Sequence, residues 1–335
     1  MTLAETIGRK LKESSVKVDE YILSILEPRK PEVLYEAARH LIEAGGKRLR
    51  PYLVLRSCAL VGGDPKQALP YAAALEVLHN FTLVHDDIMD NDDLRRGAPT
   101  VHAKWGVPMA IIGGDLLFAK VYEAMIDPAV RGEVPVERAV ACIDRVNEAT
   151  VLLCEGQALD SAFPNVDDVS TDDYLFMVGG KTSALFKACA EVGGIMGGAD
   201  PEDVRSLGEF AWNAGIAFQI VDDVLGVTTD ESTLGKPVGS DLREGKKTLI
   251  VIKALENASD EEGTTLKRVL GVHDFTESDL EAAREVLRST GGIDFAMATA
   301  EEYVRKSEEA ISTFPTSTAK KDLLDFVEYF TKRIF

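Results

Sequence analysis

Apolar residues recur along this chain mainly at steps of three and four, which is the spacing of one face of an α-helix. Alternating apolar and polar runs between turn residues are scarce, so the sequence predicts no major β-sheet. We therefore expect an all-α protein, folded as a single domain over residues 1–335. The helical spacing is found in segments rich in Ala, Leu and Glu: residues 31–60, 68–90, 135–158, 171–192, 201–226 and 245–257.

The longest predicted loop is "GVTTDESTLGKPVGSDLREGKK", residues 226–247. It is dense in Gly, Ser, Thr, Asp and Lys. A loop of this length inside a compact domain usually has a function.

Composition restricts the possible partners. The chain has 335 residues, of which 45% are hydrophobic, and its net charge is −19. This charge argues against binding to nucleic acid or to anionic membrane surfaces. The four cysteines are far apart and indicate reduced thiols. We find no signal-type stretch and no apolar run long enough for a transmembrane segment, so we expect a cytoplasmic protein.

The first candidate site is "HDDIMDNDDLRRG", residues 85–97. Asp86 and Asp90 are four residues apart, so both carboxylates lie on the same helix face. Like charges at this spacing destabilise a helix by roughly a few tenths of a kcal/mol, about as much as one ion pair stabilises it. Two carboxylates on one face suit Mg²⁺, which binds carboxylates together with substrate phosphates. Taken alone, a solvated acidic helix face explains the motif equally well.

A second acidic motif favours the metal interpretation. "GIAFQIVDDVLG", residues 215–226, places Asp222 and Asp223 at the end of an apolar helical run. Carboxylates in such surroundings are costly unless they are paired or metal-bound. Gly215, Gln219 and Asp222 share one helix stripe. Two such helix ends are able to hold a cluster of Mg²⁺ ions.

Four basic segments accompany the acidic motifs, and each places Lys or Arg beside Gly. Such groups bind phosphates, with the backbone close to the ligand at Gly. Each segment alone is explained by ordinary surface charge. Together with the acidic motifs, they favour a site for two polyanionic ligands, only one of them bound through metal. The segments are "GGKRLRP" (45–51), "LRRG" (94–97), "GGKTSALF" (179–186) and "GKPVGSDLREGKKT" (235–248).

This ordered set of motifs resembles that of the trans-isoprenyl diphosphate synthases, and most narrowly the archaeal-type geranylgeranyl diphosphate synthases. The resemblance runs from about residue 20 to the C-terminus. It implies a single large helical bundle around a deep central cavity, usually a homodimer. It also implies Mg²⁺-dependent head-to-tail (1'-4) condensation of isopentenyl diphosphate with allylic diphosphates, which yields (all-E) prenyl diphosphates.

The resemblance assigns roles to individual residues. The implied metal ligands are Asp86, Asp90 and Asp222, with Asp87 and Asp223 in support. The implied isopentenyl diphosphate site comprises Gly46, Lys47, Arg50, His79 and Arg96. The implied allylic diphosphate site comprises Arg95, Lys181, Thr182, Gln219, Lys236 and Lys246. The ring face of Phe218 is a candidate to stabilise a carbocation.

Two positions depart from the family pattern. Gly226 stands where many relatives have a further aspartate, which puts one outer carboxylate in doubt. The C-terminal "TKRIF" matches the basic tail of relatives only loosely, so Lys332 and Arg333 receive no role.

Product length is predicted from the residues before the first motif. Phe81 is five residues before Asp86, and therefore about 7–8 Å further down the helix. In the family, bulky residues here form a floor under the growing chain, and we assign Phe81, Thr82 and Leu78 to it. One aromatic beside a small Thr82 predicts geranylgeranyl diphosphate for isoprenoid lipids. Farnesyl diphosphate or a mixture is the alternative, and Phe81 is equally compatible with a plain core position.

Three other functions were weighed. A cyclising terpene synthase also uses an aspartate-rich motif, but it needs no second, metal-free diphosphate site. A non-catalytic partner subunit often loses an aspartate motif, whereas both leading pairs are intact here. A generic acidic helical scaffold does not explain basic residues beside glycines.

Overall fold

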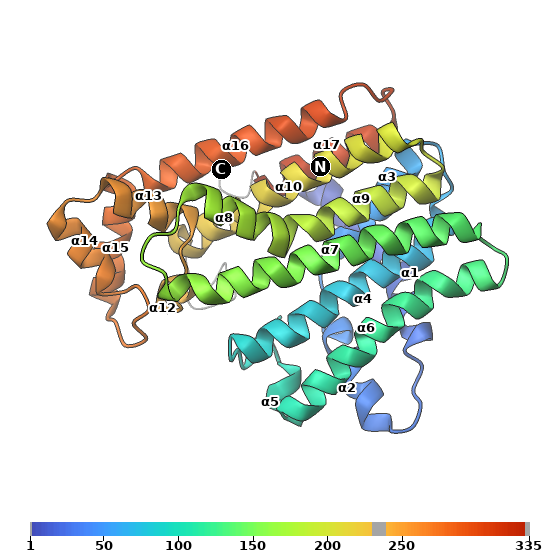
Figure 1. The fold of residues 1–335 in the computed structure, drawn as a ribbon, viewed down its shortest axis with the longest axis horizontal. Helices are drawn as coiled ribbons and strands as arrows, with labels where there is room; N and C mark the ends of the chain where they lie inside the picture. Colours follow the sequence, from blue (N-terminus) through green and yellow to red (C-terminus); the bar gives the residue numbers. More distant parts are fainter. Residues whose placement is uncertain (1, 230–238, 332–335) are drawn as a thin grey trace. The chain divides into compact units, whose positions relative to one another are not determined.

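The computed structural model describes residues 2–229 and 239–331, and it is almost entirely helical (Figure 1). Among these residues the only β-structure is a two-stranded antiparallel ladder, in which Leu94 pairs with Pro99. The prediction of an all-α fold is confirmed. No helix within the described ranges combines the length and the apolar character needed to cross a bilayer.

The elements follow one another with short connections. In the first half of the chain they are α1 (Leu3–Ile25), α2 (Glu32–Glu43), α3 (Leu49–Leu60), α4 (Pro65–Met89), β1 (Leu94–Arg95), β2 (Ala98–Pro99), α5 (Val101–Trp105), α6 (Val107–Val130), α7 (Val136–Ala162) and the 3₁₀ turn η1 (Phe163–Asn165). The second half contains α8 (Thr171–Val178), the π-helix η2 (Gly179–Ser183), α9 (Ala184–Gly197), α10 (Pro201–Thr228), α12 (Ser240–Arg243), α13 (Leu249–Asn257), α14 (Asp260–Lys267), α15 (Glu277–Ser289), α16 (Gly292–Ala310) and α17 (Thr318–Thr331).

One predicted helical segment is broken in the structure. The segment 31–60 divides into α2 and α3, because residues 44–48 leave the helical conformation. Gly45 has φ 92° and Arg48 has φ 50°, values that no right-handed helix can continue. The segment 171–192, in contrast, runs without a break through α8, η2 and α9.

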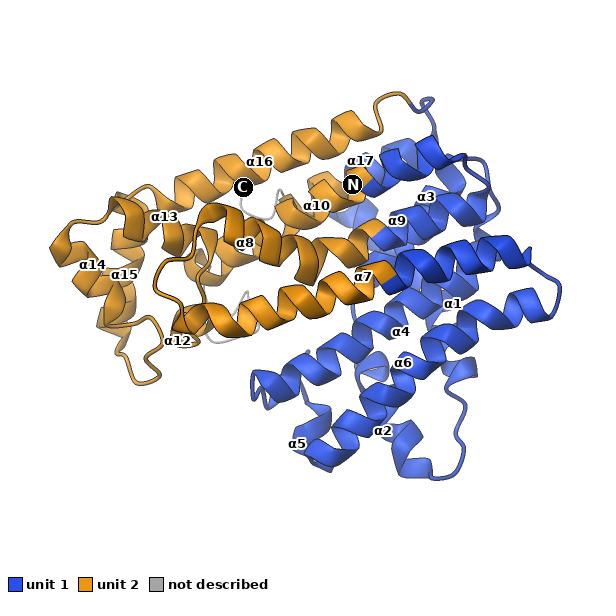
Figure 2. Cartoon of the chain, in the orientation of Figure 1, with its two compact units in different colours: residues 1–147, 188–208, 314–325 blue, residues 148–187, 209–313, 326–335 orange. Residues whose placement is uncertain are grey.

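The chain divides into two compact units, coloured blue and orange in Figure 2. Unit 1 comprises residues 1–147, 188–208 and 314–325, and unit 2 comprises residues 148–187, 209–313 and 326–335. The expectation of one domain over residues 1–335 stays a prediction.

Unit 1 is organised around α4. This helix packs against α6, α3 and α1, and its residues 71–78 are buried on every side. A helix that is apolar all round belongs inside a core. The Asp64 carboxylate caps its start by accepting a hydrogen bond from the Lys66 backbone N–H at 3.0 Å. Because α4 ends at Met89, the first acidic motif occupies its last turn.

Unit 2 has its own apolar core, to which α8, α10, α13 and α16 contribute. The side chains of Ile216, Ile220 and Val224 on α10 lie in this core. The helical spacing of these residues leaves Gln219 and Asp222 on another face of α10.

Candidate functional site

The carboxylates of the first motif have different surroundings. Asp86 and Asp90 are partly exposed, whereas Asp87 is completely buried. The Nε of Arg95, on β1, donates a hydrogen bond to Asp87 Oδ1. Burial raises the pKa of Asp87, and the charge of Arg95 opposes that rise. Asp87 therefore fixes Arg95, while its two neighbours remain accessible.

The end of α4 is an unfavourable place for anions. The last turn of a helix carries partial negative charge from its free carbonyl groups, so aspartates there are destabilised unless a cation compensates them. Asp87 Oδ2 is buried and makes no hydrogen bond within the described residues. These hard oxygen donors fit a divalent cation such as Mg²⁺.

The described residues hold no group of three or more His, Cys, Asp or Glu side chains placed to bind a metal. Mg²⁺ typically takes one or two carboxylates and completes its shell with water and substrate phosphates.

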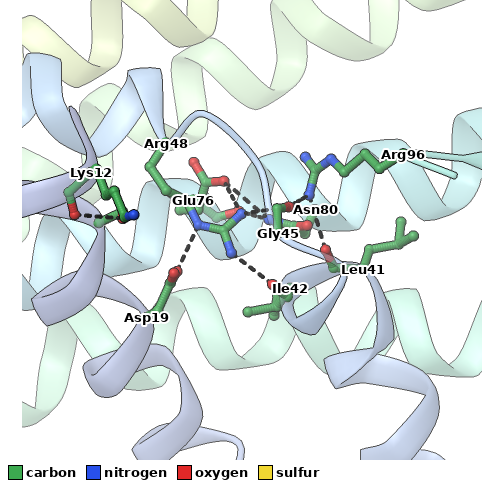
Figure 3. Close-up of polar contacts among 10 residues, drawn as sticks. Lys12, Asp19, Leu41, Ile42, Gly45, Arg48, Glu76, Asn80 and Arg96 are labelled. Carbon is green, nitrogen blue, oxygen red and sulfur yellow. Dashed lines mark hydrogen bonds and ion pairs between the residues drawn. The ribbon is translucent and has the colours of Figure 1, made fainter. Parts of the chain in front are cut away.

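The loop between α2 and α3 is built around the buried Arg48 (Figure 3). Its guanidinium donates to Asp19 Oδ1 at 2.6 Å and to Glu76 Oε1 at 3.1 Å. It also donates to the backbone carbonyls of Ile42 at 2.8 Å and Gly45 at 3.1 Å. Four bonds to one guanidinium hold the loop in its left-handed conformation. Arg48 is therefore a structural residue inside the motif "GGKRLRP".

Beside this loop, a cationic cluster surrounds His79. Burial lowers the pKa of His79 well below its usual value, and the charges of Arg50, Arg96, Arg95 and Arg48 lower it further. His79 is therefore neutral among four arginines, a field that favours a bound anion.

Two predicted residues of this region meet directly. A guanidinium nitrogen of Arg96 donates to Leu41 O at 2.9 Å and also to Gly45 O. A Cβ at Gly46 would lie 3.0 Å from the Arg96 guanidinium carbon, so only glycine fits here without a shift. Lys47 is exposed on the same loop.

In unit 2, the second motif takes part in a chain of hydrogen bonds. Thr182 Oγ1 donates to Gln219 Oε1 at 2.9 Å, and Gln219 Nε2 donates to Asp223 Oδ1 at 2.8 Å. The Tyr174 hydroxyl donates to Asp223 Oδ2 at 2.6 Å. Burial and the nearby carboxylate of Asp241 raise the pKa of Asp223 to about 7. The structure thus joins three predicted residues, with Asp223 holding the amide of Gln219.

Lys181 lies in the π-helix η2, a local widening that often occurs at functional sites. Its ammonium group pairs with Asp160 of α7. Close backbone packing fixes the position: a Cβ at Gly156 would lie 2.2 Å from Lys181 N, and a Cβ at Gly180 would lie 2.5 Å from Leu152 O.

Lys246 is held by two carboxylates, Glu244 at 2.6 Å and Asp241 at 3.7 Å. Burial lowers the pKa of Lys246, but these two carboxylates outweigh it and raise the pKa overall. Asp241 also lies near the departure from the family pattern, since a Cβ at Gly226 would be 3.1 Å from Asp241 Oδ2. The predicted residue Lys236 is outside the described residues, as are Lys332 and Arg333.

The aromatic ring of Phe218 packs against two other rings of unit 2. The centroid distances are 5.6 Å to Phe186 and 5.2 Å to Phe330.

The predicted floor residues lie at one level of α4. Leu78 is fully buried, and Thr82 is largely buried. The ring of Phe81 lies 5.1 Å from Phe118 on α6 and 4.7 Å from His85. Phe81 thus belongs to an aromatic group that extends to α6 and includes Phe118, a residue that no sequence motif indicated.

Other residues of the site were also missed. Four of them contact a predicted residue, or its loop, from a distant part of the sequence: Asp19, Glu76, Asp160 and Tyr174. Asp241 is only five residues from the Lys246 that it contacts.

Comparison with known proteins gives consistent results. A family model described as polyprenyl synthetase matches residues 31–287. The geranylgeranyl diphosphate synthase of Saccharolobus solfataricus is 45% identical over 304 residues, covering 90% of this chain and 91% of that protein.

Two solved structures are also similar. The geranylgeranyl pyrophosphate synthetase of Pyrococcus horikoshii has a TM-score of 0.92 and 45% identity, with 98% of this chain and 99% of that chain covered. A polyprenyl synthase of Caulobacter crescentus, complexed with calcium and isoprenyl diphosphate, has a TM-score of 0.88 and 30% identity, with 98% of each chain covered.

The Arg48 network yields a stability prediction. Replacing Arg48 with Ala leaves the Glu76 carboxylate buried without its main partner, so we expect a loss of about 3–5 kcal/mol in the free energy of unfolding. Arg9→Ala is the control, because its pair with Glu13 is exposed, and it should cost less than about 1 kcal/mol. Urea unfolding at neutral pH measures both. Equal midpoints for the two variants would show that the network contributes no stability.

Proposed function

The chain belongs to the polyprenyl synthetase family of prenyltransferases, which lengthen prenyl chains head to tail, and within it we propose a geranylgeranyl diphosphate synthase. The observation that carries the proposal is the contact of Arg96 with the Gly45 carbonyl, which places an arginine of the cationic cluster at the glycine loop, in the same unit as the carboxylates Asp86 and Asp90. One diphosphate binds without metal at the cluster, and the other binds through Mg²⁺.

The family is metal-dependent, and a solved relative contains calcium with isoprenyl diphosphate. We propose Asp86, Asp90 and Asp222 as ligands of Mg²⁺. Bound Mg²⁺ neutralises charge on the departing diphosphate as a Lewis acid. Asp87 and Asp223 support the site, since the former holds Arg95 and the latter holds Gln219.

The allylic diphosphate is proposed to bind a set of cationic and polar groups. Lys181 and Lys246 are each paired with carboxylates, which fixes where their ammonium groups lie. Thr182 and Gln219 are fixed by the hydrogen-bond chain. The full set is Arg95, Lys181, Thr182, Gln219, Lys236 and Lys246.

Isopentenyl diphosphate is not ionised in the reaction, so its diphosphate needs charge but no metal. Lys47, Arg50 and Arg96 supply the charge. Neutral His79 has a ring N–H available to donate to a phosphate oxygen. The backbone at Gly46 allows close approach because the residue has no side chain.

The reaction begins when the allylic C–O bond breaks, with diphosphate leaving as the charge on it is stabilised. The apolar residues of the helices exclude water, which would otherwise capture the carbocation. The face of Phe218 stabilises positive charge. The double bond of isopentenyl diphosphate attacks the cation, and the released diphosphate accepts the proton that is then lost.

The proposed product has twenty carbons and serves isoprenoid lipid biosynthesis. Farnesyl diphosphate, alone or in mixture, is the alternative. Incubation with labelled isopentenyl diphosphate and each allylic starter, followed by chain-length analysis, tests the assignment. Products that are cyclic hydrocarbons would instead identify a terpene synthase.

The metal assignment predicts the effect of two substitutions. Asp86→Ala and Asp222→Ala should each reduce turnover by about a hundredfold or more, since charge on the leaving group loses its stabilisation. Asp93→Ala is the matched control, because Asp93 is an exposed acid of the same motif, and it should retain turnover. EDTA should stop the parent reaction. Near-normal turnover of either Asp86→Ala or Asp222→Ala, with circular dichroism unchanged, contradicts the assignment.

The two diphosphate sites predict opposite kinetic patterns. Lys47→Ala and Arg96→Ala should raise KM for isopentenyl diphosphate about ten- to a hundredfold, because a charge-assisted bond contributes about 1.5–3 kcal/mol. Lys181→Ala and Arg95→Ala should mainly change KM for the allylic substrate or kcat. Steady-state kinetics with each substrate varied separates the cases, and the reversed pattern refutes the two-site assignment.

The floor assignment predicts a change in product length. Phe81→Ala should open space below the first motif and give products longer than those of the parent chain. Phe176→Ala is the control, because this aromatic on α8 is 61% exposed, and it should leave the products unchanged. Thin-layer or mass analysis of dephosphorylated products measures the length. Identical products from Phe81→Ala and the parent would show that Phe81 is only a core residue.

We also propose that the protein is a homodimer in the cytoplasm. Exposed apolar residues line α6 from its start (Val107, Ile111, Ile112) to its end (Ile126, Val130). Apolar side chains in one region of a surface are typical of subunit interfaces. Ile112→Glu should shift the protein to monomer in sedimentation equilibrium, whereas Val272→Glu, at another exposed site, should not. A parent protein that sediments as a monomer contradicts the proposal, and recovery in the membrane fraction of lysed cells contradicts the location.

A further inference from the structure

Unit 1 contains a pocket of about 410 Å³ that the proposed reaction does not use. It lies among α1, α3, the start of α4 and the start of α17. None of its lining residues belongs to the proposed metal, isopentenyl diphosphate or allylic diphosphate sets. Its volume is within the range of small-molecule sites, about 300–1,000 Å³.

The pocket is cationic in a strongly acidic protein. Its lining carries four basic and two acidic side chains, a net charge of +2, whereas the whole chain carries −19. The basic side chains are Lys10, Lys17, Arg56 and Lys66, and the acidic ones are Glu13 and Asp322.

A buried carboxylate fixes two of these cations. Asp322 is 2% exposed, and it pairs with Lys10 at 2.5 Å and with Arg56 at 3.1 Å. Its two oxygens are thus each bonded to a different cation. The geometry of Lys10 and Arg56 is therefore set before any ligand arrives.

The other two cations have no such partner. Lys17 on α1 and Lys66 on α4 make no ion pair within the described residues, and both are exposed. They belong to different helices, so a ligand that contacts both bridges α1 and α4.

Helix ends and apolar side chains complete the lining. Both α4 and α17 begin at the pocket, with Pro65 and Thr318 as their first residues. The start of a helix carries partial positive charge, which at α4 is partly offset by the Asp64 cap. Leu55 and Leu69 add an apolar wall suited to a hydrocarbon group.

We propose that this pocket binds a diphosphate group, either as inorganic diphosphate or as the head of a prenyl diphosphate, at a second site apart from the catalytic residues. A diphosphate carries several charges within a few ångströms, which matches fixed and free cations on separate helices. The choice of ligand rests on the prenyltransferase chemistry of the family, but the pocket and its charge do not.

The test is equilibrium dialysis with radiolabelled inorganic diphosphate in the presence of EDTA, which suppresses metal-dependent binding. Lys17→Glu/Lys66→Glu should lose one bound equivalent per chain, or bind it at least tenfold more weakly than the parent protein. Lys12→Glu/Lys267→Glu changes net charge equally at exposed lysines outside the pocket and should bind like the parent. Lys17→Gln/Lys66→Gln, with a milder charge change, should show a smaller loss.

Kinetics distinguish this site from the catalytic one. The pocket variant, Lys17→Glu/Lys66→Glu, should have the same KM for isopentenyl diphosphate as the parent protein. This expectation does not depend on the proposed catalytic assignments. Repeating the dialysis with geranylgeranyl diphosphate identifies the source: tighter binding than inorganic diphosphate shows that the apolar wall contacts a tail, and equal binding shows that the head group suffices. The proposal is overturned if the pocket variant and the control bind diphosphate equally, or if the parent chain binds neither ligand outside the catalytic site.

Discussion

Repulsion between carboxylates is the constraint on which the rest of this structure depends. The chain places Asp86 and Asp87 in the final turn of α4 and Asp90 at its C-cap, where the helix dipole already disfavours anions. Such an arrangement is tolerable only if cations compensate it. Arg95 neutralises the buried Asp87. The partly exposed carboxylates of Asp86 and Asp90 offer oxygen atoms of the kind that bind a divalent cation.

The reverse problem occurs at the diphosphate site without metal. Four arginines influence His79, and arginines so close together also repel one another. The buried Glu76 balances part of that charge, since it pairs with Arg48, and the charges of Arg50 and Arg96 act on its pKa as well. Burial raises the pKa of Glu76, so the surrounding guanidinium groups are what favour its charged form. Glu76 is thus the buried acidic counterpart of this group of arginines.

Much of the fold is predictable from the spacing of apolar residues, because a helix that buries one face carries apolar residues along that face. The break between α2 and α3 is not predictable from this spacing, because Arg48 adopts a left-handed conformation that few non-glycine residues accept. Contacts with Asp19 and Glu76, 29 and 28 residues away, stabilise it. The same limit applies to Tyr174, which is 49 residues from the Asp223 it contacts. The motifs identify candidate residues, but only the burial in the structure separates an enclosed carboxylate such as Asp87 from a partly exposed one such as Asp86.

The two units divide the chemistry unevenly. Unit 1 contains the cationic cluster and the first acidic motif, whereas unit 2 contains the second motif with Lys181 and Lys246 already paired to acids. In both units cations are paired with carboxylates, so an anionic ligand must compete with groups such as Asp87 in unit 1 and Asp160 or Glu244 in unit 2. A diphosphate carries more negative charge than a single carboxylate, so it is able to compete for Lys181 and Lys246. We propose that isopentenyl diphosphate, whose C–O bond does not break, binds at the cluster in unit 1 without metal, whereas the acidic motifs serve the allylic diphosphate that ionises.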